Sequence, residues 1–135
     1  MATVYKRVEV NADAAEVWDA LRDWTALHTR LARGFITDLE VDGDDRIITL
    51  FNGARARERL ITRDDERRRL VWTVVDGPYT HHNGVAHVET DEDGRTYFVW
   101  TADLLPDELH PHIDALMGAG IDAIKKTLES GQTLN

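Results

Sequence analysis

Between residues 35 and 104 the sequence falls into six short segments of alternating hydrophobicity, each separated from the next by a short turn. We expect strands at 35–41, 46–51, 54–62, 70–75, 81–90 and 95–104. Asn52-Gly53 and Asp76-Gly77-Pro78 are the clearest turn signals between them. Connections this short join antiparallel neighbours, because a parallel crossover needs a dozen or more residues. The segment is therefore predicted to form an antiparallel meander.

Helical patterns flank the meander on both sides. A strand over 3–10 precedes a predicted helix from about 13 to 23 and a second short helix over 25–32. After Pro106, a long helix is predicted from about 107 to 129, with apolar residues at three- and four-residue spacing. Gly118 and Gly120 interrupt it, and glycine costs a helix about 1 kcal/mol relative to alanine, so the pair indicates a bend or a close approach to the sheet.

This order of elements predicts an α+β fold in one domain spanning residues 1–135. A curved antiparallel sheet of about seven strands would wrap around the long C-terminal helix, with two short helices after the first strand. Such a sheet and helix enclose a cavity unless large side chains fill the space. Ala56, Gly84 and Ala86 are small residues at expected inward positions, and Leu70 shares its predicted face with Trp72 and Val74. A solid core built from the same residues is the alternative.

The charge of the chain argues against two classes of function. The formal net charge of −9 argues against a nucleic-acid-binding protein and against electrostatic binding to an anionic membrane. Seven arginines between residues 55 and 69 are interleaved with acidic residues, which is typical of a solvated strand face and its turn.

The same sequence argues against several kinds of site. It has no cysteine, and the spacing of its six histidines fits no metal site, so we expect neither a metal nor a cofactor. No apolar run approaches the ~20 residues of a membrane helix, which predicts no membrane insertion. No signal-peptide pattern is visible, and the expected location is the cytoplasm.

Several segments resemble one protein superfamily. They are Glu58 to Arg68 (ERLITRDDERR) with the turns Asn52-Gly53 and Val75-Asp76-Gly77-Pro78, the opening Val8 to Trp18 (VEVNADAAEVW), and Val99-Trp100-Thr101-Ala102 near the end. Together they resemble the polyketide cyclase/dehydrase-like branch of the START/Bet v 1 (SRPBCC) superfamily, over about Val4 to Leu128. The resemblance implies the helix-grip fold and an internal apolar cavity. Members include aromatase/cyclases, plant enzymes and receptors, and lipid carriers, so the fold alone does not choose the activity.

The resemblance also implies which residues face the cavity. Glu58 matches a strand glutamate that points inward, and the two-residue period places Ala56 and Leu60 on the same face. The turn Pro78-Tyr79-Thr80 is a candidate lid at the mouth. The full predicted ligand-binding set is Trp24, Ala56, Glu58, Leu60, Trp72, Val74, His82, Gly84, Val99, Thr101, Met117 and Ile121.

Glu58 and His82 are the candidate catalytic residues. Burial raises the pKa of a carboxyl group, and histidine titrates near neutral pH, so the two could form an acid–base pair. The alternative is that Glu58 pairs with an arginine or a water and only orients a ligand. The predicted function is binding of a hydrophobic small molecule, such as a polyketide, a lipid or an aromatic metabolite. The alternative function is a cofactor-independent polyketide cyclase or dehydratase.

The last strand carries a second hypothesis. With Val99 and Thr101 facing inward, Phe98 and Trp100 would form an apolar patch on the outer face, beside Val71 and Val85. Patches of this kind often mark association, which suggests a homodimer formed through the sheet. A register shift of one residue would bury the two aromatic side chains instead.

Overall fold

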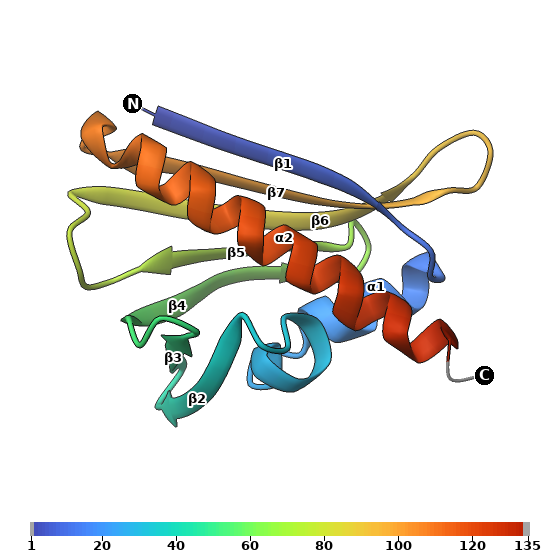
Figure 1. The fold of residues 1–135 in the computed structure, drawn as a ribbon, viewed down its shortest axis with the longest axis horizontal. Coiled ribbons are helices and arrows are strands. Elements are labelled where there is room, and N and C mark those ends of the chain that lie inside the picture. The colour runs from blue at the N-terminus through green and yellow to red at the C-terminus, as the bar shows by residue number, and fades with distance from the viewer. Residues whose placement is uncertain (1, 134–135) are drawn as a thin grey trace.

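The computed structural model describes residues 2–133 and shows a single sheet wrapped around one long helix (Figure 1). The strands are β1 (Ala2–Val10), β2 (Ile36–Asp42), β3 (Asp45–Leu50), β4 (Arg55–Asp64), β5 (Arg69–Val74), β6 (His81–Thr90) and β7 (Thr96–Leu105). The helices are α1 (Ala14–Arg22), the π-helical turn η1 (Leu27–Leu31), the 3-10 turn η2 (Asp107–Leu109) and α2 (His110–Thr133). The predicted order of elements is confirmed, except that a 3-10 turn precedes the long helix.

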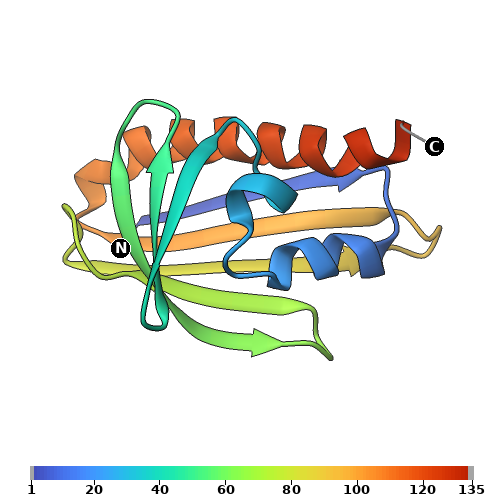
Figure 2. The same ribbon diagram turned by 90° about the horizontal axis from the view of Figure 1, so that it is seen from below.

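All seven strands pair antiparallel in the order β1-β7-β6-β5-β4-β3-β2. β2 to β7 form the predicted meander, and β1 joins its far edge by pairing with β7, with Val4 opposite Ala102. Both edges of the sheet curl toward the same side, and α2 lies along that concave side (Figure 2). The α+β helix-grip architecture expected from the sequence is confirmed.

The core lies between α2 and the concave face. Ile113 and Met117 of α2 pack with Val4, Ala102 and Leu104 of the sheet. Further along α2, Ile121 and Ile124 join a second cluster with residues of α1, η1 and the central strands. Burial of these side chains contributes about 25 cal/mol per Å² of apolar surface and fixes the helix over the sheet. No helix among residues 2–133 is long and apolar enough to cross a membrane.

Arg55, Arg57 and Arg59 of β4 lie on the convex face, as their alternation predicts. Arg57 and Arg59 both bind Asp45 of β3, with Nε–carboxylate distances of 2.7 and 2.9 Å, and Arg55 pairs with Glu40 of β2. The Arg59 and Arg57 guanidinium groups lower the pKa of Asp45 to about 2. This side of the sheet is a network of ion pairs between neighbouring strands.

The two glycines of α2 have different surroundings. A Cβ at Gly120 would lie 2.8 Å from Trp100 Cζ3 and 3.0 Å from Phe35 Cε2, closer than real Cβ contacts. The nearest atom to a Cβ at Gly118 would be Lys6 Nζ, at 3.9 Å. The expected close approach to the sheet is therefore confirmed at Gly120, where the aromatic side chains need the space.

Gly120→Ala and Gly118→Ala should change stability in opposite directions. The Gly120 variant should lose about 1–3 kcal/mol of unfolding free energy, because the methyl group overpacks against two aromatic rings. The Gly118 variant should gain up to ~1 kcal/mol, because alanine is the better helix former and the site is open. Urea denaturation of both variants measures this, and equal effects would contradict the close approach at Gly120.

Candidate functional site

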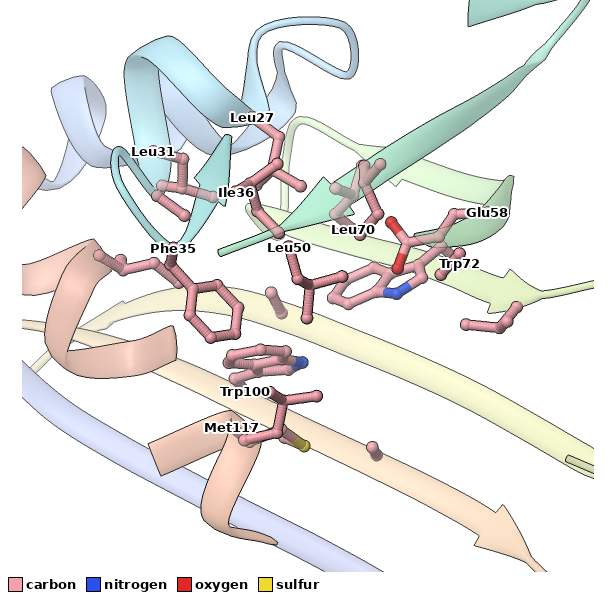
Figure 3. A pocket seen from close by; sticks show the side chains of 18 of the residues that line it. Leu27, Leu31, Phe35, Ile36, Leu50, Glu58, Leu70, Trp72, Trp100 and Met117 are labelled. Atoms are coloured by element: carbon pink, nitrogen blue, oxygen red, sulfur yellow. The ribbon is translucent and has the colours of Figure 1, made fainter. Parts of the chain in front are cut away.

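A cavity of about 140 Å³ lies between the concave face of the sheet and α2 (Figure 3). Most of its wall is apolar and comes from α1, η1, α2 and the strands β2 to β7. The wall consists of Leu21, Leu27, Leu31, Ala32, Phe35, Ile36, Arg46, Ile48, Leu50, Ala56, Glu58, Leu70, Trp72, Val74, Tyr79, His82, Ala86, Phe98, Trp100, Ala102, Ile113, Leu116, Met117 and Ile124. The structure thus has free space at the place where the sequence leaves open either a solid core or a cavity.

A buried ion pair forms one part of the wall. Arg46 of β3 lies directly opposite Glu58 of β4 in the ladder, and its Nε and Nη2 lie 2.9 and 2.8 Å from Glu58 Oε1. The two side chains are 4% and 9% exposed. Burial lowers the pKa of Arg46, and the Glu58 carboxylate opposes that shift. Because removal of one partner from a buried pair typically costs 3–5 kcal/mol, each residue depends on the other.

Trp24 contacts the Arg46 guanidinium through both its ring and its backbone carbonyl. Its ring stacks on the Arg46 guanidinium, with Cζ 3.6 Å from the ring centroid, and its carbonyl oxygen accepts a hydrogen bond of 2.9 Å from Arg46 Nη1. Trp24 lies in the link between α1 and η1 and is 6% exposed. It therefore fixes the ion pair, although it does not itself line the cavity.

His82 lines the cavity at the point where the β5–β6 ladder stops. The ladder ends at Trp72 and Gly84, and beyond it the Val74 backbone N–H donates a hydrogen bond of 3.2 Å to His82 Nδ1. Burial, followed by the charge of His81, lowers the pKa of His82 from 6.5 to about 4. The imidazole is thus neutral at pH 7, and since Nδ1 accepts a hydrogen bond, the proton is on Nε2.

Tyr79 completes this end of the cavity. Its ring centroid lies 4.9 Å from that of His82, and burial, aided by the Glu58 charge, raises its pKa above 10. Tyr79, Val74 and His82 also line a hollow on the outside of the β5–β6 turn. The candidate lid Pro78-Tyr79-Thr80 thus contributes Tyr79 to the wall between the cavity and this hollow.

The position of the Trp72 indole requires a glycine at residue 84. A Cβ at Gly84, its partner across the β5–β6 ladder, would lie only 2.6 Å from Trp72 Cε2. Gly84 therefore leaves room for the indole to lie against β6. Figure 3 shows Glu58, Trp72 and Trp100 directed into the same space.

The structure divides the predicted ligand-binding set in two. Ala56, Glu58, Trp72, Val74, His82 and Met117 lie in the cavity wall. Trp24, Leu60, Gly84, Val99, Thr101 and Ile121 do not. Gly84 lies beneath Trp72, Leu60 packs at the edge of the core, and Ile121 is buried within it.

The predicted orientation of β7 is wrong by one residue. Ala86 and Gly84 of β6 lie opposite Trp100 and Ala102, and opposed residues of antiparallel strands share a face. Phe98, Trp100 and Ala102 therefore face the cavity, whereas Val99 and Thr101 face the convex side. The aromatic patch proposed for the outer face is absent, and the homodimer hypothesis loses its basis.

The alternative in which Glu58 pairs with an arginine agrees with the structure, but the sequence did not identify Arg46 as that arginine. Arg46, Ile48 and Leu50 share one face of β3 by the two-residue period, so an arginine on an apolar face was the available signal. For β7 the signal was Asp103, a charged residue on the same face as Val99 and Thr101, which favours the convex side for that face even though Val99 itself is 1% exposed.

This arrangement presents a small set of polar groups to an apolar space. Arg46 donates through Nε and Nη2 to the Glu58 carboxylate and through Nη1 to the Trp24 carbonyl oxygen. Both contacts to Glu58 end on Oε1, and no described side chain donates to Oε2. The groups available to a bound molecule are therefore the Glu58 carboxylate as an acceptor, His82 Nε2–H as a donor, and the Tyr79 hydroxyl.

The lowered pKa of His82 makes stability depend on pH in a defined direction. The unfolded chain takes up a proton as the pH falls below about 6.5, whereas the folded protein resists protonation until about pH 4. The His82 contribution is therefore complete above pH 6.5 and is lost between 6.5 and 4. Relative to His82→Gln, the wild type should lose about 2–3 kcal/mol of unfolding free energy between pH 7.5 and 4.5, measured in urea. An imidazole that titrates near pH 6.5 by NMR would contradict this.

Similarity to solved structures supports the fold. The chain is 22% identical to a point mutant of norcoclaurine synthase from Thalictrum flavum in complex with a transition-state analogue, with a TM-score of 0.75 and coverage of 97% of this chain and 96% of that one. For a START superfamily protein from Mycobacterium smegmatis the identity is 15%, the TM-score 0.72, and the coverage 98% and 99%. The di-domain aromatase/cyclase BexL of the BE-7585A biosynthetic pathway is 14% identical, with a TM-score of 0.79, and the chain spans 96% of its own length but 47% of that protein.

At the level of sequence, no curated protein matches the chain. The protein-family model for polyketide cyclase/dehydrase and lipid transport matches residues 1–130. This match covers nearly the whole chain and agrees with the helix-grip fold and its internal cavity. The protein belongs to the polyketide cyclase/dehydrase and lipid-transport family.

Proposed function

We propose that the protein binds an apolar small molecule in the cavity between the sheet and α2. The observation that carries the proposal is a cavity of about 140 Å³ whose wall is apolar except at one end, where Arg46, Glu58, Tyr79 and His82 lie. Ligand sites typically combine an apolar wall with a few placed polar groups that orient the ligand. The family description, which joins cyclases with lipid transport, supports a small-molecule ligand of this kind.

The polar groups favour binding over acid–base catalysis. Arg46 holds the Glu58 carboxylate, and the Val74 N–H occupies Nδ1 of His82. At pH 7 the His82 ring carries its one proton on Nε2, so it can donate a hydrogen bond into the cavity but cannot accept a proton there. These contacts orient a bound molecule more readily than they move its protons.

A cofactor-independent cyclase or dehydratase is the second candidate. It is favoured by the presence of Glu58, His82 and Tyr79 at the same end of the cavity, and by the family to which aromatase/cyclases belong. In such an enzyme, Glu58 would accept a proton from the substrate, and His82 Nε2–H would stabilise the developing oxyanion.

Partly filling the cavity should weaken binding. Ala86 is 1% exposed and lines the cavity, so the larger side chain of Ala86→Leu takes up part of the free volume. We expect its affinity for toluene, followed through NMR shifts of the Trp72 and Trp100 indole N–H groups, to fall at least ~10-fold. Val85→Leu, on the same strand but directed to the opposite face, is the matched control and should bind like the wild type. If the control lost as much affinity as Ala86→Leu, binding would not occur in this cavity.

Glu58→Gln separates the two candidate functions. If the protein is a cyclase, turnover of a suitable polyketide should fall by about 10²–10⁴ while the protein still binds the apolar ligand. Binding of toluene, which offers no polar group to Glu58, should persist in either case. The double variant Arg46→Gln/Glu58→Gln controls for the unpaired arginine, because it replaces both charges by neutral amides. Unchanged turnover in Glu58→Gln would remove the enzyme candidate.

A further inference from the structure

The polar groups of the cavity are gathered at one end. Glu58 lies opposite Val74 in the β4–β5 ladder, and His82 contacts the Val74 backbone through Nδ1 on the other side. The three residues thus form one row across β4, β5 and β6, with Tyr79 against His82. The following rows along β5 and β6 are apolar and contain Trp72 and Leu70. A bound molecule therefore meets polar groups at one end only.

This polar end carries no net charge. The Arg46 guanidinium is neutralised by the Glu58 carboxylate, and His82 and Tyr79 are neutral at pH 7. An anionic ligand would find the one cation already paired, and a cationic ligand would find the one carboxylate already paired. Because a buried charge without a partner is costly, the cavity favours an uncharged ligand.

The hydrogen-bonding capacity of this end is also defined. Glu58 can accept a hydrogen bond from the ligand, and His82 Nε2–H can donate one to it. A hydroxyl is the smallest uncharged group that both donates and accepts, and it does so through a single oxygen atom. A ligand without a polar group would leave these buried atoms unsatisfied, which lowers its affinity.

The cavity also limits the size of its occupant. Its volume of about 140 Å³ is close to the ~150 Å³ of a buried apolar cavity that accommodates benzene. The rings of Phe35, Trp72, Phe98 and Trp100 provide aromatic walls, against which another ring packs well. A fused polycyclic product or a fatty acyl chain exceeds this volume.

We infer that the ligand is an uncharged aromatic molecule with a single ring and a hydroxyl group, its ring between Trp72 and Trp100 and its hydroxyl at Glu58 and His82. This inference rests on the proposed function and narrows it. Within the range of polyketides, lipids and aromatic metabolites expected from the sequence, it selects the smallest aromatic compounds.

A matched series of probes tests the inference by NMR titration of the intact protein. Phenol supplies the ring and the hydroxyl, anisole has an oxygen without a donor, toluene has no polar group, and benzoate is anionic. Phenol should bind about 2–10-fold more tightly than toluene, in line with one or two net hydrogen bonds, with anisole between them. Benzoate should bind at least ~10-fold more weakly than phenol. Anthrone and laurate, as a tricyclic compound and an acyl chain, should not compete with phenol.

The variant Glu58→Gln should change the order of preference. It removes the partner of Arg46, so benzoate gains a counter-ion and should bind at least as tightly as phenol, while toluene is unaffected. Circular dichroism establishes whether the variant is folded. The probe series on the wild-type protein tests the inference even if the variant does not fold.

The outcomes distinguish failure of this inference from failure of the proposed function, the binding of an apolar small molecule. If anthrone or laurate binds more tightly than phenol, or benzoate more tightly than phenol in the wild type, the inference is wrong, but the protein still binds apolar molecules. If none of the six compounds binds, both the inference and the proposed function are overturned.

Discussion

The buried ion pair between Arg46 and Glu58 governs the chemistry of the cavity, and several parts of the fold converge on it. The pair joins β3 to β4, and Trp24 connects it to the segment between α1 and η1 by a stacked ring and a carbonyl hydrogen bond. The two charges neutralise each other, so the polar end can be desolvated without an excess charge. The carboxylate then remains available as an acceptor in an otherwise apolar space.

The cavity itself exists because small and large residues are matched across it. Gly84 allows the Trp72 indole to lie against β6, and Gly120 allows α2 to approach Trp100 and Phe35. A side chain at either glycine would displace an aromatic ring that forms the wall. The positions of these rings, and hence the shape of the space, follow from where glycine occurs in a strand and in a helix.

Most of the architecture could be predicted from the sequence, because strand alternation, turn residues and helical spacing are local properties. The inward position of Glu58 followed from the family resemblance and the two-residue period. The orientation of β7 was harder to predict, since both of its faces carry apolar residues, a shift of one residue exchanges them, and Asp103 is its one charged residue. The partner of Glu58 was also beyond local patterns: Arg46 is on another strand, and sequence alone does not set the β3–β4 register. The volume of the cavity depends on the packing of all the side chains at once.

A crystal structure determined under xenon pressure is the decisive experiment for an accessible apolar cavity between the sheet and α2. Xenon occupies apolar cavities of this size. We expect xenon density bounded by Trp72, Ala86 and Trp100, with the Arg46–Glu58 pair intact beside it. Side chains that fill this space, with no xenon between the sheet and α2, would contradict it.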